Sequence, residues 1–153
     1  MGSIEKTIAE IRESGGDVYF DTNAFIYFLD GGTQFSKKIH PFFEAVDSGQ
    51  ISGSTGDLVI AELLVKPIRD GNVIAERMIR SLFDAMGKFR VLPHDRGTLE
   101  LAAYIRARQN LAMPDAIHVA TAISARCSHM ITNDSKIAHR IEGMKSILIS
   151  ELE

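Results

Sequence analysis

Cysteine and long apolar runs are both scarce in this sequence. Cys127 is the single cysteine, so the chain contains neither an internal disulfide nor a cysteine-based zinc site. A chain without a disulfide framework fits a reducing compartment, and we expect a cytoplasmic protein. The longest strongly apolar stretch, Leu58 to Val65, is interrupted by Glu62 and is far shorter than the roughly 20 residues of a bilayer span. We therefore expect no transmembrane helix and no membrane partner.

The sequence also has no excess of positive charge and little glycine or proline. Its 17 Lys and Arg residues against 20 Asp and Glu residues give a net charge of −3, which excludes a strongly basic nucleic-acid-binding protein. The 12 glycines, 4 prolines and 45% apolar residues exclude the disordered and collagen-like classes. A chain of 153 residues is long enough for one globular domain with a sizeable core.

Short β-prone runs alternate with helical patterns along the chain. Strands are predicted at residues 18–20, 51–54, 90–92, 130–132 and 146–149, and helices at residues 4–11, 24–29, 37–47, 73–88, 96–109, 115–126 and 135–141, with one more helix that Asp57 caps and that weakens at Pro67. This alternation predicts an α/β fold in which helices cover both faces of a parallel sheet of about five strands.

Four acidic residues are placed where such a sheet binds ligands. Asp21 and Asp134 each follow an apolar strand, and ligands bind at the carboxyl ends of the strands in open α/β sheets. Asp115 lies in the first turn of a predicted helix, and Glu62 lies on the helix after the second strand. Right-handed crossovers bring both of these acids toward the same edge of the sheet.

Glu62 gives the strongest indication of a metal site. Apolar residues precede and follow it, so almost any orientation of its helix partly buries the carboxylate. Burying an unpaired carboxylate costs several kcal/mol or shifts its pKa, and a bound cation would remove that cost. Carboxylate oxygens are the ligands that Mg²⁺ and Mn²⁺ prefer, so we interpret the four acids as a site for one of these ions.

Each of these residues also has a purely structural explanation. Asp21 can cap a helix, Asp115 can favour a helix dipole, and Asp134 can form an Asx turn. His118 stands three residues after Asp115, where either a metal ligand or proton shuttle or a packing histidine would fit. The four acids together, rather than any one of them, favour a shared site.

Four short motifs, taken in order, resemble the successive signatures of PIN domains. They are VYFDTN at residues 18–23, AELL at 61–64, PDAIHVATA at 114–122 and ITND at 131–134. The resemblance runs from about Asp17 to the C-terminus, and the compact size is similar to that of VapC-like toxins of toxin-antitoxin pairs. Each motif alone is weak, whereas four in this order are specific.

This resemblance implies a three-layer α/β/α sandwich and a ribonuclease that depends on Mg²⁺ or Mn²⁺. The catalytic and metal-binding residues would be Asp21, Glu62, Asp115 and Asp134, with Asn23 and Thr132 at supporting polar positions. It also implies an RNA substrate, a small antitoxin as partner and a homodimer.

The resemblance divides the chain into two parts. Residues 1–16 form a helical extension, because such toxins usually begin almost at the first strand, and residues 17–153 form the nuclease domain. Packing, contact with a partner and disorder all remain open for the extension.

Basic residues in the middle of the chain are candidates for contact with RNA. Nine basic residues stand against five acidic ones between Lys66 and Arg108, so this segment is locally positive. The candidates for holding an RNA backbone are Lys66, Arg69, Arg77 and Arg80. An ordinary solvated helix face is the alternative for them.

Other activities fit the sequence less well. An aspartyl-phosphate phosphatase needs an Asp two residues after Asp21, where this chain has Asn23, and no phosphate-binding loop of the GK[ST] type is present. A catalytically silent PIN-like module that binds RNA or protein remains the alternative to a nuclease, and the complete set of four acids argues against it.

Overall fold

A computed structural model describes residues 2–85 and 87–153. The elements, in chain order, are α1 (Ser3–Ser14), β1 (Asp17–Phe20), α2 (Thr22–Asp30), α3 (Gln34–Asp47), β2 (Ser52–Gly56), α4 (Asp57–Arg69), α5 (Val73–Ala85), β3 (Phe89–Leu92), α6 (Arg96–Gln109), α7 (Met113–Ser124), β4 (His129–Thr132), α8 (Ser135–Ala138), β5 (Lys145–Leu148) and the 3₁₀ helix η1 (Ile149–Glu151). The predicted alternation of strands and helices is confirmed.

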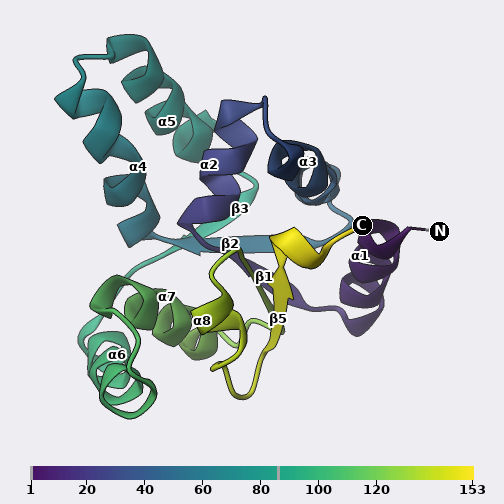
Figure 1. Cartoon of the computed structure of the whole chain (residues 1–153), viewed down its shortest axis with the longest axis vertical. Coiled ribbons are helices and arrows are strands. Elements are labelled where there is room, and N and C mark those ends of the chain that lie inside the picture. Colours follow the sequence, from purple (N-terminus) through teal and green to yellow (C-terminus); the bar gives the residue numbers. More distant parts are fainter. Residues whose placement is uncertain (1, 86) are drawn as a thin grey trace.

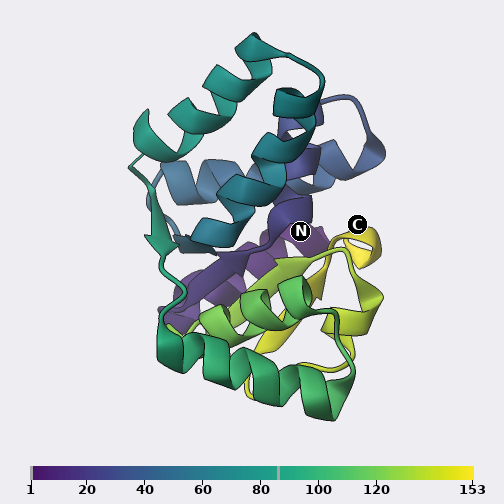
Figure 2. The ribbon, with the colours of Figure 1, turned by 90° about the vertical axis from the view of Figure 1, so that its left-hand side faces the viewer.

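The five strands form one sheet in the order β3-β2-β1-β4-β5, and all neighbours are parallel. Helices α1 to α5 cover one face of this sheet and α6 to α8 cover the other (Figures 1 and 2). The predicted three-layer α/β/α sandwich is therefore confirmed.

Side-chain alternation along the strands creates two separate cores. Val18 and Phe20 enter the core under α1 to α5, whereas Tyr19 between them enters the core under α6 to α8. All three side chains are fully buried. The first core is rich in aromatic rings, among them Phe43, whose ring packs edge-on against Phe20 at a centroid distance of 5.2 Å.

The strand order changes direction at β1, the central strand of the sheet. The chain places β2 on one side of β1 and β4 on the other, so the connections that leave the carboxyl ends of β1 and β4 pass to opposite faces. Such a switch point opens a crevice at the carboxyl ends of the two strands. Asp21 and Asp134 are located there.

The N-terminal helix α1 packs against α3, in the helical layer that covers one face of the sheet. Its Ile11 is fully buried and Ile8 nearly so, both in the aromatic core. The hydroxyl of Ser3 accepts a hydrogen bond from the backbone N–H of Glu153 at 2.7 Å, which joins the two ends of the chain. None of the helices within residues 2–85 and 87–153 is long and apolar enough to cross a membrane.

Several element boundaries differ from those predicted. The helix expected at 135–141 ends at Ala138, and Ile149 begins a 3₁₀ helix instead of ending the last strand. The helix expected at 73–88 is seen as α5 up to Ala85, and Met86 lies outside the described residues. The predicted cap at Asp57 is wrong, because the N-cap residue is Gly56 and makes no side-chain cap.

A histidine from another part of the chain caps α4 instead. Nε2 of His94 accepts a hydrogen bond from the backbone N–H of Leu58 at 2.9 Å, and Nδ1 lies 2.8 Å from the hydroxyl of Thr121 on α7. That hydroxyl donates to the carbonyl oxygen of Ile117 at 2.6 Å, so Nδ1 of His94 carries the proton. The ring packs so closely on Gly56 that a Cβ there would lie 2.6 Å from Cε1 of His94. Glycine is therefore required at this position.

We predict that the His94 cap makes stability depend on pH. Burial lowers the pKa of His94 below the usual histidine value of 6.5, so the folded state binds fewer protons than the unfolded state as the pH falls. Its contribution is therefore present above pH 6.5 and is lost as the pH falls through the lower folded-state pKa. His94→Gln should cost about 1 kcal/mol at pH 7, as expected for a lost cap, and should lose less stability between pH 7 and pH 5 than wild type does.

Urea unfolding of both proteins at pH 7 and pH 5 measures this difference. The exposed His139 provides a matched control through His139→Gln. Equal pH dependence in wild type and His94→Gln would contradict the prediction.

Candidate active site

Asp21 and Asp134 lie at the carboxyl ends of two hydrogen-bonded strands. The backbone N–H of Asp21 donates to the carbonyl oxygen of Ile131 on β4 at 3.2 Å. Each acid also begins a helix: Oδ1 of Asp21 accepts from the backbone N–H of Asn23 at 3.0 Å, and Oδ1 of Asp134 accepts from that of Lys136 at 2.9 Å. Helix capping thus fixes both side chains through one oxygen each.

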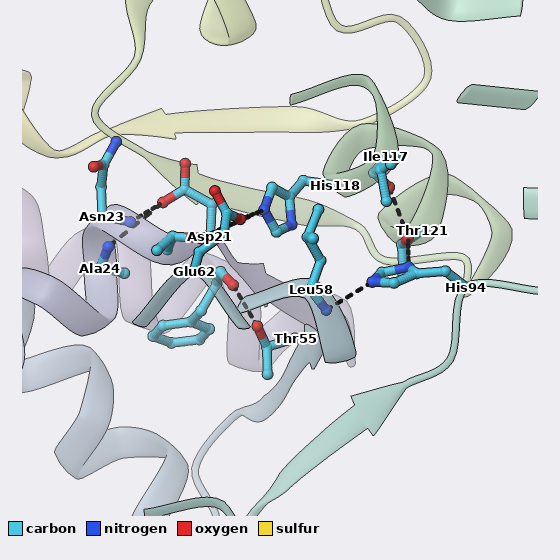
Figure 3. A network of polar contacts seen from close by, with 12 residues as sticks. Asp21, Asn23, Ala24, Thr55, Leu58, Glu62, His94, Ile117, His118 and Thr121 are labelled. Atoms are coloured by element: carbon cyan, nitrogen blue, oxygen red, sulfur yellow. Dashed lines mark hydrogen bonds and ion pairs between the residues drawn. The ribbon is translucent and has the colours of Figure 1, made fainter. Parts of the chain in front are cut away.

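The predicted supporting residues Thr132 and Asn23 differ in what they contact. The fully buried hydroxyl of Thr132 accepts from the backbone N–H of Asp134 at 3.0 Å, and its hydrogen bond with the carboxylate of Asp21 lowers the pKa of that acid. Thr132 therefore connects Asp21 to Asp134. Asn23 supports Asp21 through its backbone N–H (Figure 3).

Glu62 reaches the site from α4 and is held by two side chains. Its Oε1 lies 2.6 Å from Nε2 of His118 and accepts a hydrogen bond from the hydroxyl of Thr22 at 2.9 Å. Figure 3 shows the His118 ring beside Glu62 and Asp21. The sequence offered no Lys or Arg as partner for Glu62, and the structure supplies a histidine instead. With 33% of its side chain exposed, Glu62 does not need a metal ion to compensate for burial.

Asp115 is the acid with the fewest contacts. It is half-buried in the first turn of α7, and its carboxylate receives no hydrogen bond from the described residues. Burial raises its pKa, and the negative charges of Asp134 and Glu62 raise it further. Asp115 therefore lies within range of the charges of both Asp134 and Glu62.

The buried carboxylate of Asp21 also has an unfavourable electrostatic environment. Only 4% of the residue is exposed, and burial raises the pKa of Asp21 to about 6, although hydrogen bonds from Thr132 and the α2 backbone oppose this shift. The pKa of Glu62 is lowered, because the hydrogen bonds from His118 and Thr22 outweigh its burial. Within residues 2–85 and 87–153, neither Asp21 nor Asp115 forms a salt bridge, although the charge of Lys136 partly opposes the raised pKa of Asp115.

The chemistry of these groups fits a hard divalent cation. Asp21, Asp115, Asp134 and Glu62 offer only oxygen atoms as metal ligands, and none of the described residues donates a hydrogen bond to the half-buried carboxylate of Asp115. Within residues 2–85 and 87–153, no three Asp, Glu, His or Cys side chains are already close enough to hold one ion. Mutual repulsion keeps like charges apart, so an ion would have to draw the acids together.

The predicted RNA contacts are spread over two helices. Lys66 and Arg69 are on α4, Arg77 and Arg80 are on α5, and all four are exposed. Arg80 pairs with Glu76 at 3.0 Å on the surface of its own helix. Lys66 is the one that borders the same cavity as Glu62, a space of about 390 Å³ between α2, α4 and α5.

Sequence reasoning overlooked several residues that hold the site together. Tyr19, Thr22, His94 and Thr121 form hydrogen bonds that orient Glu62 or the start of α4. Asn133 fixes the loop before Asp134, since its amide donates to the hydroxyl of Tyr27 at 3.0 Å. The alternation of side chains along the strand could have predicted that Tyr19 lies on the same face of the sheet as α7. No pattern in the sequence indicates the contacts between the helices.

Solved structures that resemble this chain include proteins of toxin-antitoxin systems. A toxin-antitoxin complex from Klebsiella pneumoniae has a chain with 23% identity and a TM-score of 0.64, with 86% of this chain and 97% of that chain covered. FitAcB from Neisseria gonorrhoeae has 16% identity and a TM-score of 0.70, with 88% and 99% covered. VapC20 of Mycobacterium tuberculosis, a toxin that cleaves the sarcin-ricin loop, has 13% identity and a TM-score of 0.66, with 80% and 93% covered.

Because all three identities are below 25%, these similarities establish the fold alone. No curated protein sequence matches the chain. A model of the PIN domain family matches residues 18–142, a segment that contains all four acids and both supporting residues. The chain belongs to the PIN domain family.

Proposed function

We propose that this protein is a metal-dependent ribonuclease and the toxin of a toxin-antitoxin pair in the cytoplasm. The observation that carries the proposal is the position of Asp21 and Asp134 after two neighbouring strands, at the switch point of the sheet, together with the charges of Asp134 and Glu62 that act on Asp115. The PIN family membership and the toxins among the structural neighbours support it.

In this proposal the four acids hold Mg²⁺ or Mn²⁺. When bound, the ion would supply Lewis-acid chemistry, by lowering the pKa of a water molecule and offsetting negative charge on the phosphodiester. Thr132 and the start of α2 orient Asp21, and His118 and Thr22 orient Glu62. Lys66, Arg69, Arg77 and Arg80 would hold the RNA backbone and would contribute no sequence preference of their own.

We predict that Asp21→Asn, Asp115→Asn and Asp134→Asn each abolish Mn²⁺-dependent cleavage of RNA and leave the protein folded. Each substitution removes a ligand charge at nearly constant size, so we expect losses above the roughly 10- to 100-fold typical of outer-shell partners. Glu62→Gln should cost about 10- to 100-fold, because its Oε1 is already bound by the protein.

The measurement is single-turnover cleavage of a labelled RNA with Mn²⁺ and with EDTA. The exposed Asp47 at the end of α3 gives a matched control, and Asp47→Asn should cleave like wild type. Wild-type protein that binds RNA and does not cleave it in Mn²⁺ would favour the catalytically silent module.

We predict that Mn²⁺ stabilises the protein more than an equal ionic strength of NaCl. Binding to the native state contributes about 2.7 kcal/mol at a hundredfold excess over Kd, and each kcal/mol shifts Tm by about 2–4 °C in a domain of this size. Asp21→Asn should raise Tm in EDTA, since it removes a buried charge, and should shrink the Mn²⁺ increment. Thermal melts in EDTA and in Mn²⁺ test both effects, and an equal increment in the two proteins would exclude Asp21 as a ligand.

We predict that a small antitoxin binds the cavity between α2, α4 and α5. The cavity joins apolar side chains, including Ile26 and Met78, to the acidic Glu62, so it suits an apolar segment with an Arg or Lys near its end. Met78→Glu should weaken binding of the antitoxin by at least tenfold and leave cleavage intact. Isothermal titration measures the affinity, and Leu99→Glu on the exposed face of α6 is the control.

We also expect a homodimer at micromolar concentration, which light scattering tests. A monomer that binds no small protein encoded beside it would argue against the toxin assignment and leave the nuclease assignment intact.

A further inference from the structure

A buried chain of hydrogen bonds lies behind Glu62. The hydroxyl of Tyr19 lies 2.8 Å from Nδ1 of His118, and Nε2 of the same ring lies 2.6 Å from Oε1 of Glu62. Tyr19 is fully buried and His118 is 3% exposed. The chain runs from the core under α7 to the acidic edge of the sheet and ends on one oxygen of one acid.

The chemistry of the two end groups fixes where the protons lie. Oε1 of Glu62 already accepts a hydrogen bond from the hydroxyl of Thr22, so it acts as an acceptor, and Nε2 of His118 donates to it. The phenol of Tyr19 is protonated at neutral pH, and its fully buried hydroxyl needs an acceptor in the core. Nδ1 of His118 is that acceptor, so Tyr19 selects the ring tautomer with the proton on Nε2.

The two bonds to Glu62 both end on the same oxygen. Oε1 accepts from Nε2 of His118 and from the hydroxyl of Thr22 at 2.9 Å. No hydrogen bond to Oε2 is formed by residues 2–85 and 87–153 of the structure. The carboxylate is therefore held at Oε1, and Oε2 is the oxygen left for a ligand.

We propose that Tyr19 and His118 are positioning residues that hold Glu62 through Oε1 and present its Oε2 to a divalent cation, directly or through water. This inference rests on the proposed metal-dependent function. It also decides between the two interpretations of His118 that the sequence left open: both ring nitrogens are occupied and the ring is buried, so His118 acts through Glu62 and is not itself a metal ligand.

Substitution of His118 by either of two amide residues distinguishes a positioning role of this side chain from a role in packing alone. In His118→Gln the side-chain N–H lies as far along the chain as Nε2, so it can still donate to Glu62 but cannot replace Nδ1. In His118→Asn the side-chain oxygen matches Nδ1, so it can still accept from Tyr19 but cannot reach Glu62. Each variant loses one of the two hydrogen bonds, so a purely structural role predicts similar effects of both on every property.

The experiment measures Mn²⁺ affinity by electron paramagnetic resonance and Tm in EDTA for wild type and both variants. We expect His118→Asn to weaken Mn²⁺ binding by about 10- to 100-fold, as is typical for outer-shell partners, and His118→Gln to stay close to wild type. Equal Mn²⁺ affinity in the two variants overturns the proposal, provided that Asp21→Asn still impairs binding. If Asp21→Asn and Asp115→Asn bind Mn²⁺ like wild type, the proposed metal site itself has failed.

A second variant covers the case in which the His118 substitutions do not fold. Tyr19→Phe removes the hydroxyl and keeps the ring in the core, so it releases the tautomer of His118 while the fold is retained. Nitrogen NMR without metal should find Nε2 of His118 protonated and Nδ1 unprotonated in wild type, and should find this preference weakened in Tyr19→Phe. A proton on Nδ1 and none on Nε2 in wild type would overturn the positioning role.

Discussion

The parallel pairing of β1 with β4 is the interaction on which the rest of the site depends. Its register places Phe20 beside Ile131, so Asp21, which follows β1 directly, and Asp134, two residues after the end of β4, emerge at one edge. Thr132, the last residue of β4, then connects the two acids. A slip of one residue would reverse every side chain in the strand and would remove Thr132 from this position.

Helix α7 has a second organising role, because it positions α4 as well as Asp115. His118 contacts Glu62 directly, and Thr121, one turn further on, contacts the His94 ring that caps α4 at Leu58. Two histidines therefore link the helices that provide Glu62 and Asp115. Negative charge can be concentrated at this edge because hydrogen-bond donors hold Asp21 and Glu62 from behind.

The sheet and the four acids could be predicted from the sequence. The residues that hold the acids in place through hydrogen bonds could not. Strand runs such as residues 18–20 and 130–132 are local patterns, and the polar residue after each is visible in the sequence. His94 lies in a loop and caps the start of a helix 36 residues earlier in the chain, a contact that no local pattern reveals. The predicted cap at Asp57 was wrong because a capping rule that considers only neighbouring residues cannot include this contact. The partner of Glu62 likewise comes from 56 residues away.

Gly56 shows how the site constrains a residue that takes no part in its chemistry. A Cβ at this position would lie 2.6 Å from Cε1 of His94 and 2.7 Å from the hydroxyl of Tyr19, so it would push on both rings that support α4 and His118. A methyl group at position 56 would therefore disturb Glu62 indirectly, through Tyr19 and His118 and through the His94 cap of α4. In evolutionary terms, positions 19, 56 and 94 are expected to vary together: a larger residue at 56 becomes acceptable only where one of the other two has become smaller.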